Sequence, residues 1–223
     1  MADRGALKER MKRAAHGAID PLVRGLARTG VTPDIITVTG LGFSLVAAIA
    51  FLDGAFRAGA AFLAVSGVFD LLDGQLARNR GHVTRFGAFL DSTLDRLGEA
   101  VVLAGIAGFY LVHLVRLTGD PMLLMDELDR GLEPRTWAVL GLTAVLALIG
   151  SFLVSYTRAR AEGLGLECRV GWFERPERLG LLILAGLFGV GPAMPAALIL
   201  LTLLSFVTAT QRVAHVWKQT RGG

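Results

Sequence analysis

The sequence predicts an all-α integral membrane protein in which six transmembrane helices follow an N-terminal amphipathic surface helix. Of its 223 residues, 53% are hydrophobic and only 19% are charged, and the mean hydropathy is +0.55. Soluble domains average about 45–50% apolar and about 25% charged residues. The apolar residues also gather in long runs flanked by basic ones, as expected of segments that cross a bilayer.

Residues 1–34 are predicted to form a cytoplasmic juxtamembrane helix. Ile19, Leu22, Val23 and Leu26 recur at helical spacing after a strongly basic start. A helix with one apolar and one basic face can lie in the membrane surface. A packing helix without lipid contact is the alternative.

Residues 35–216 predict the six-helix transmembrane domain, and residues 217–223 form a cytoplasmic tail. A spanning helix needs roughly 20 mainly apolar residues. Glycine and alanine are frequent within these segments, and small residues let helices approach closely in lipid. The expected spans are Ile35–Leu52, Gly59–Ala77, Phe86–Val115, Trp137–Arg158, Leu179–Val190 and Ala193–Val213.

The distribution of basic residues predicts the orientation. Eighteen of the 23 lysines and arginines fall on the side of the termini, four fall on the opposite side, and Arg96 lies within a span. The positive-inside rule therefore places both termini and the motif-bearing helix ends in the cytoplasm of a multi-pass cell-membrane protein. The net charge of +4 then suits anionic membrane lipids and phosphate substrates better than nucleic acid, which is not an expected partner.

Four aspartates form the strongest chemical signal. Asp70 and Asp73 are three residues apart, and Asp91 and Asp95 are four apart, so each pair shares one helix face. The turn at residues 79–85 makes the two helices antiparallel neighbours, so the pairs can face each other. The sequence therefore predicts a four-carboxylate cluster at one membrane surface.

Divalent cations explain why this cluster is tolerated. An ionisable side chain within a span costs about 2.5–3.5 kcal/mol by the lower estimates. Mg²⁺ prefers carboxylate oxygens and keeps positions for phosphate oxygens, and two ions can clamp a diphosphate. A solvated acidic face on soluble helices and a cation-transport path are the alternatives. Gly74 leaves room for a close substrate, and Arg78 lies one turn beyond, suitably placed for a phosphate.

These motifs resemble the signature of the CDP-alcohol phosphotransferases. The matching pattern is Asp70-x-x-Asp73-Gly74-x-x-Ala77-Arg78, eight residues, then Gly87-x-x-x-Asp91-x-x-x-Asp95. The segment from Thr32 to Thr37 also resembles the family's nucleotide-contacting segment. The resemblance implies six transmembrane helices, a homodimer, and two Mg²⁺ or Mn²⁺ ions held by Asp70, Asp73, Asp91 and Asp95.

The resemblance also implies the reaction. Asp95 would be the general base that takes a proton from the acceptor hydroxyl, and the hydroxyl would attack the β-phosphorus of a CDP-linked lipid such as CDP-diacylglycerol, releasing CMP. The implied contacts to the CDP-lipid are Asp34, Ile35, Ile36, Thr37, Gly74, Arg78 and Thr84.

The second half of the chain bears on the acceptor. Arginines cluster where the fourth span ends and the fifth begins, as expected for a phosphorylated acceptor. These segments resemble the phosphatidylinositol-phosphate synthases of actinobacterial type, which implies that inositol 1-phosphate is the acceptor. One difference is that Arg158 stands where those proteins have lysine. The implied contacts are Ser155, Arg158, Arg160, Arg178 and Arg212.

Three other functions remain as alternatives. Glycerol 3-phosphate is the rival acceptor, which would make the protein a phosphatidylglycerophosphate synthase. A membrane prenyltransferase also uses two aspartate-rich motifs and Mg²⁺, but its motifs lack the Gly-x-x-Ala-Arg continuation. A cation transporter would not need Gly74, Arg78 and the arginine cluster together.

Overall fold

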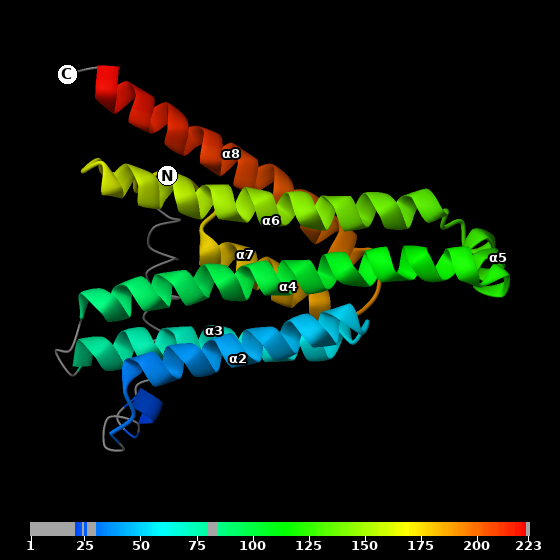
Figure 1. The fold of residues 1–223 in the computed structure, drawn as a ribbon, viewed down its shortest axis with the longest axis horizontal. Coiled ribbons are helices and arrows are strands. Elements are labelled where there is room, and N and C mark those ends of the chain that lie inside the picture. The colour runs from blue at the N-terminus through cyan, green and yellow to red at the C-terminus, as the bar shows by residue number, and fades with distance from the viewer. Residues whose placement is uncertain (1–20, 24, 26–29, 80–83, 222–223) are drawn as a thin grey trace. The chain divides into compact units, whose positions relative to one another are not determined.

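The computed structural model describes residues 21–23, 25, 30–79 and 84–221, and within these ranges every regular element is a helix. Most of the predicted N-terminal amphipathic helix therefore lies outside the described residues. Figure 1 shows the described helices in chain order. They are α2 (Pro33–Leu52), α3 (Phe56–Asn79), α4 (Arg85–Gly119), α5 (Pro121–Asp129), α6 (Pro134–Gly163), α7 (Arg175–Leu187) and α8 (Ala193–Arg221).

Five of the described helices are long and apolar enough to cross a membrane, which agrees with a membrane protein. They are α2, α3, α4, α6 and α8. Helix α7 has only 13 residues, a length of about 20 Å at 1.5 Å per residue. That is shorter than the hydrocarbon core of about 30 Å, so α7 does not qualify by length as the expected sixth span.

The chain divides into two compact units. The first unit contains the described residues of Met1–Phe43 and Ala64–Asp95, and the second contains those of Ser44–Leu63 and Arg96–Gly223.

The first unit is built on close packing between α2 and α3. Ile36 of α2 joins Leu72 and Leu76 of α3 in a small apolar core. A Cβ added at Gly40 would lie 3.2 Å from the Cβ of Phe69, so glycine allows the two helices to approach. The hydroxyl of Ser66 also donates to the carbonyl of Gly40 at 2.9 Å. These contacts hold the two helices that carry Thr37 and Asp73.

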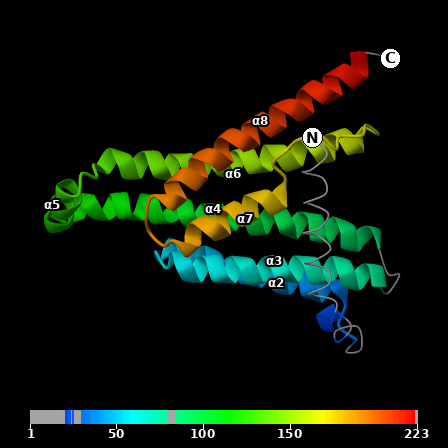
Figure 2. The ribbon, with the colours of Figure 1, turned by 180° about the vertical axis from the view of Figure 1, so that it is seen from behind.

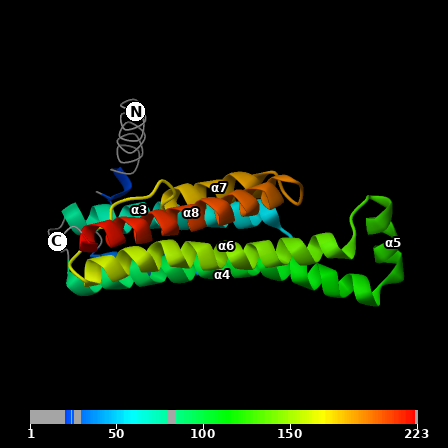
Figure 3. The same cartoon turned by 90° about the horizontal axis from the view of Figure 1, so that it is seen from above.

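The second unit contains the larger apolar core. Its fully buried side chains include Phe51, Leu103, Ile106, Leu182 and Leu201. Helix α8 packs against both α6 and α7, and Figures 1 and 2 show it crossing α6 obliquely. Figure 3 shows α4 and α6 running side by side to α5.

Helix α5 forms in the connection between α4 and α6. The carboxylate of Asp120 accepts from the amides of Met122 and Leu123 at 3.0 and 3.2 Å, and proline follows as the first helical residue. Both features satisfy or remove free N–H groups at a helix start. This short helix was not predicted from the sequence.

Candidate active site

Three of the four predicted aspartates converge in the first unit. One carboxylate oxygen from each of Asp70, Asp91 and Asp95 lies within 4.8 Å of the other two, and all three residues are half-buried. Asp70 lies on α3, and Asp91 and Asp95 lie one turn apart on α4. The four-residue spacing of Asp91 and Asp95 sets two of these ligands on one face of α4, and the packing of α3 beside it adds Asp70.

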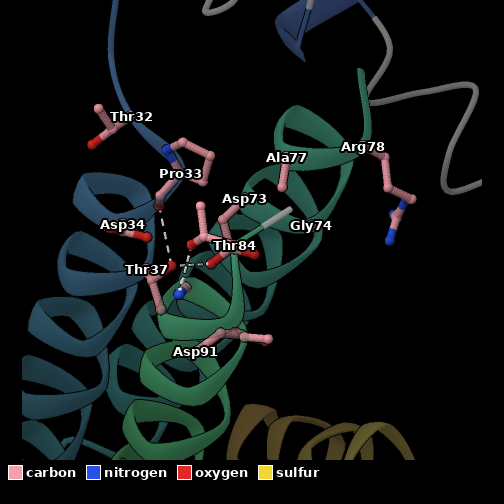
Figure 4. A pocket seen from close by; sticks show the side chains of 12 residues that line it. Thr32, Pro33, Asp34, Thr37, Asp73, Gly74, Ala77, Arg78, Thr84 and Asp91 are labelled. Carbon is pink, nitrogen blue, oxygen red and sulfur yellow. Dashed lines mark hydrogen bonds between the residues drawn. The ribbon is translucent and has the colours of Figure 1, made fainter. Parts of the chain in front are cut away.

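Asp73 is not one of these three converging residues. Its side chain is buried, with 5% exposed, and its Oδ2 accepts a hydrogen bond of 2.7 Å from the hydroxyl of Thr37. Figure 4 shows Thr37 between Asp73 and the carbonyl of Pro33. Burying a carboxylate oxygen without a hydrogen-bond partner costs free energy, and the Thr37 hydroxyl supplies that partner. The hydrogen bond also links α2 to the motif on α3.

A cavity of about 670 Å³ lies beside these aspartates. Its size falls in the range of small-molecule sites. The lining residues are Thr32, Pro33, Asp34, Thr37, Asp73, Gly74, Ala77, Arg78, Thr84, Gly87, Ala88 and Asp91. Of the predicted CDP-lipid residues, five line it: Asp34, Thr37, Gly74, Arg78 and Thr84. Two do not, because Ile36 is packed in the small core and Ile35 is exposed.

Two helix N-termini meet the cavity wall. Helix α2 begins at Pro33 directly after Thr32, and α4 begins at Arg85 directly after Thr84, whose hydroxyl accepts from the amide of Gly87 at 2.9 Å. Helix N-termini carry partial positive charge and favour anions. Arg78 adds a full positive charge at the end of α3 (Figure 4). The cavity therefore offers both oxygen ligands and cationic groups.

Two glycines, Gly74 and Gly87, line the cavity. A Cβ at Gly87 would lie 2.9 Å from the hydroxyl of Thr84 and 3.3 Å from the carboxylate of Asp34. At Gly74, a Cβ would approach the guanidinium of Arg78 at 3.5 Å. A side chain would therefore crowd polar groups of the lining at Gly87, whereas the distance at Gly74 is an ordinary van der Waals contact.

The aspartates fit a hard divalent cation. They supply only carboxylate oxygens, the ligands that Mg²⁺ and Mn²⁺ prefer. Their oxygens already converge from two helices, and the adjoining cavity leaves space for phosphate oxygens.

The predicted acceptor residues belong to the second unit, where acidic partners accompany them. The Nε of Arg158 donates to Oε1 of Glu162 at 2.9 Å, and its Nη1 lies 3.9 Å from Oε1 of Glu174. The side chain of Arg212 is buried and donates to the carbonyls of Val154 and Val170. Ser155 is half-buried and Arg160 is exposed.

Arg178 forms a buried ion pair with Glu99. The two side chains are 1% and 4% exposed, and Nε and Nη2 of Arg178 donate to the two carboxylate oxygens at 2.5 and 2.7 Å. Its Nη1 donates to the carbonyl of Phe173 at 3.4 Å. This paired geometry anchors the first turn of α7 to α4.

Sequence reasoning missed two acidic residues of this region, Glu99 and Glu174. Glu99 follows Asp95 by four residues in α4, so the spacing that singled out Asp91 and Asp95 also places Glu99 on their face. No comparable signal marked Glu174, because its arginine neighbours come from distant segments.

Comparisons with known proteins agree with the motif. The family model described as CDP-alcohol phosphatidyltransferase matches residues 30–215. An archaetidylinositol phosphate synthase of Methanothermobacter thermautotrophicus is 37% identical over 206 residues, covering 91% of this chain and 90% of the relative. A phosphatidylinositol phosphate synthase of Mycobacterium bovis is 36% identical over 217 residues, covering 93% and 89%.

Solved structures of a relative show the same similarity. The phosphatidylinositol phosphate synthase of Mycobacterium tuberculosis with CDP-DAG bound has a TM-score of 0.71 and 35% identity, covering 88% of this chain and 92% of that one. The same enzyme in complex with manganese and citrate also has a TM-score of 0.71, with 34% identity and 88% coverage of each chain.

Proposed function

Because the chain belongs to the CDP-alcohol phosphatidyltransferase family, we propose that it transfers the phosphatidyl group of CDP-diacylglycerol to inositol 1-phosphate. The products are CMP and a phosphatidylinositol phosphate. The observation that carries this proposal is the convergence of Asp70, Asp91 and Asp95 beside a cavity that also presents Arg78. The names of the relatives, an archaetidylinositol phosphate synthase and a phosphatidylinositol phosphate synthase, support the acceptor.

Different residues are assigned to metal binding, to binding of the CDP part and to proton transfer. Asp70, Asp73, Asp91 and Asp95 would hold two Mg²⁺ or Mn²⁺ ions, which supply positive charge to the phosphate oxygens when bound. Arg78, Thr84 and the start of α2 bind the CDP part. Asp95 takes the proton of the acceptor hydroxyl. The oxygen of that hydroxyl forms a bond to the β-phosphorus, and the bond between this phosphorus and the CMP oxygen breaks.

Ser155, Arg158, Arg160, Arg178 and Arg212 are proposed to bind the phosphorylated acceptor. Arginine suits this role because its guanidinium matches phosphate oxygens with paired hydrogen bonds. Arg158 and Arg212 have the best support, since both approach the same carboxylate of Glu174. Glycerol 3-phosphate is the rival acceptor, and neither of these two relatives has a name that indicates it.

The membrane arrangement is part of the proposal. We infer six spans, with α7 as the short fifth, an amphipathic helix before them, and both termini and the active site on the cytoplasmic side. We also propose a homodimer, for which cross-linking of the detergent-solubilised protein is a direct test.

The test measures CMP release from CDP-diacylglycerol by the purified protein with a panel of acceptors. We expect release to require Mg²⁺ or Mn²⁺ and to be faster with inositol 1-phosphate than with glycerol 3-phosphate or free inositol. Asp95→Asn should abolish turnover while CDP-diacylglycerol still binds. Release that is absent with every phosphorylated polyol contradicts the proposed reaction.

A further inference from the structure

The loop between α6 and α7, residues 164–174, lies against α8 at Arg212. The Nε of Arg212 donates to the carbonyl of Val170 in this loop at 2.9 Å, and its Nη1 donates to the carbonyl of Val154 in α6. The Arg212 side chain is only 2% exposed. Two backbone carbonyls from different segments therefore fix the plane of the guanidinium.

These two carbonyls orient Arg212 without cancelling its charge. A carbonyl is a dipole and carries no net charge, so the guanidinium keeps its positive charge for an anion. The remaining nitrogen, Nη2, makes no hydrogen bond with the described part of the chain and lies 3.8 Å from Oε1 of Glu174, whose side chain is 35% exposed. The direction in which Nη2 points thus depends on where the loop holds the Val170 carbonyl.

Gly171 follows Val170 and allows the loop to come this close to α8. A Cβ at Gly171 would lie 2.5 Å from Cγ2 of Thr208, well inside the contact distance of two carbons. Thr208 is 2% exposed, so its methyl group cannot turn into solvent and the loop would have to move instead. The φ of Gly171 is also +116°, which disfavours any residue with a side chain. Either effect displaces the peptide unit that carries the Val170 carbonyl.

We infer that Gly171 is a positioning residue for the acceptor. Because it leaves no side chain between the loop and α8, it places the Val170 carbonyl on Arg212 and so orients the guanidinium toward the acceptor's phosphate. This inference rests on the proposed role of Arg212 and adds a residue that sets affinity for the phosphorylated acceptor. The residues proposed for the CDP-lipid belong to the other unit, so Gly171 affects the acceptor alone.

The test compares Gly171→Ala with Gly165→Ala in the full-length protein. Gly165 lies in the same loop with a φ of +76°, and a Cβ there would have no neighbour within 4 Å, so it controls for the backbone cost alone. We expect Gly171→Ala to raise the KM for inositol 1-phosphate about tenfold, near the lower end for losing a hydrogen bond to a charged group. The kcat and the KM for CDP-diacylglycerol should stay unchanged, and Gly165→Ala should change none of the three.

Thr208→Ser provides a rescue, because it removes the methyl group that the added Cβ would meet. Combined with Gly171→Ala, it should return the KM for inositol 1-phosphate part of the way to the wild-type value, since the unfavourable φ remains. This double variant also serves if Gly171→Ala does not fold. A double variant with no recovery, or a KM that rises equally for both substrates, overturns the inference.

Inorganic phosphate provides a probe that does not depend on turnover. Its stabilisation of the protein against heat should require about tenfold more phosphate in Gly171→Ala than in the wild type or in Gly165→Ala, by the same loss of one hydrogen bond. An equal requirement in all three proteins overturns the inference. Wild-type protein that is stabilised by phosphate but releases no CMP contradicts the proposed reaction instead.

Discussion

At the residue scale, the hydrogen bond between Thr37 and Asp73 links the predicted nucleotide segment to the aspartate motif. It joins two helices across 36 residues of sequence and is 2.7 Å long. The buried Asp73 carboxylate needs such a partner, since burial without one is costly. The contact therefore holds Asp73 in a defined orientation at the cavity wall.

Thr37→Val should remove this support while keeping the side-chain shape. We expect activity or metal affinity to fall by about 10- to 100-fold, as for other groups that orient metal-binding side chains. The measurement is the Mn²⁺ dependence of CMP release. Thr39→Val is the control, because the Thr39 hydroxyl is exposed and bonds to the carbonyl of Ile35 in its own helix. Equal losses in both variants would contradict a special role for Thr37.

At the scale of elements, the ion pair between Glu99 and Arg178 joins α4 to α7. Breaking a buried pair leaves one charge without compensation, at a cost of about 3–5 kcal/mol. We expect Glu99→Gln to lower the midpoint of thermal unfolding markedly, and the double variant Glu99→Leu with Arg178→Met to regain much of the loss. Glu162→Gln, which breaks an exposed pair of 2.9 Å, should change stability by only about 0.5 kcal/mol. Similar midpoints for Glu99→Gln and Glu162→Gln would show that the buried pair is not needed for stability.

Close approach between α2 and α4 in the second unit depends on Gly105. A Cβ there would lie 3.0 Å from the Cα of Ala48 and still closer to its carbonyl oxygen. Gly105→Ala should therefore destabilise the protein by about 1–3 kcal/mol through overpacking, although alanine normally stabilises a helix relative to glycine.

Gly180 on α7 offers the matched control for this substitution. A Cβ at Gly180 would have no neighbour within 4 Å, so Gly180→Ala should leave thermal stability unchanged or raise it slightly. If Gly105→Ala proved as stable as Gly180→Ala, the two helices would be free to separate at that point.

At the scale of the whole molecule, the charge asymmetry predicts which side of the membrane each loop faces. Cys168 is fully buried, so Cys168→Ala gives a background for single reporter cysteines. In intact cells, Met125→Cys on α5 should react with a membrane-impermeant maleimide, and Glu167→Cys should react only after permeabilisation. Both sites are exposed, at 62% and 82%. The reverse labelling pattern would overturn the proposed orientation.

The sequence by itself determined the helical membrane class and the aspartate motif. Apolar runs and the spacing within each aspartate pair, Asp70 with Asp73 and Asp91 with Asp95, are local properties, because a helix places residues three or four apart on one face. These features predicted six spans and four clustered aspartates; among the described residues, five helices are long and apolar enough to cross a membrane, and three of the aspartates bring oxygens together. The sequence also predicted that a group of arginines binds the acceptor, and this role stays a proposal.

Only the tertiary structure decided the partners of the charged side chains. Glu99 and Arg178 meet across 79 residues of sequence, and Glu174 lies between Arg158 and Arg212 from two other helices. Asp73 pairs in the same way with Thr37, which comes from another helix. Such pairings depend on how separate helices pack, which the local helix period does not encode.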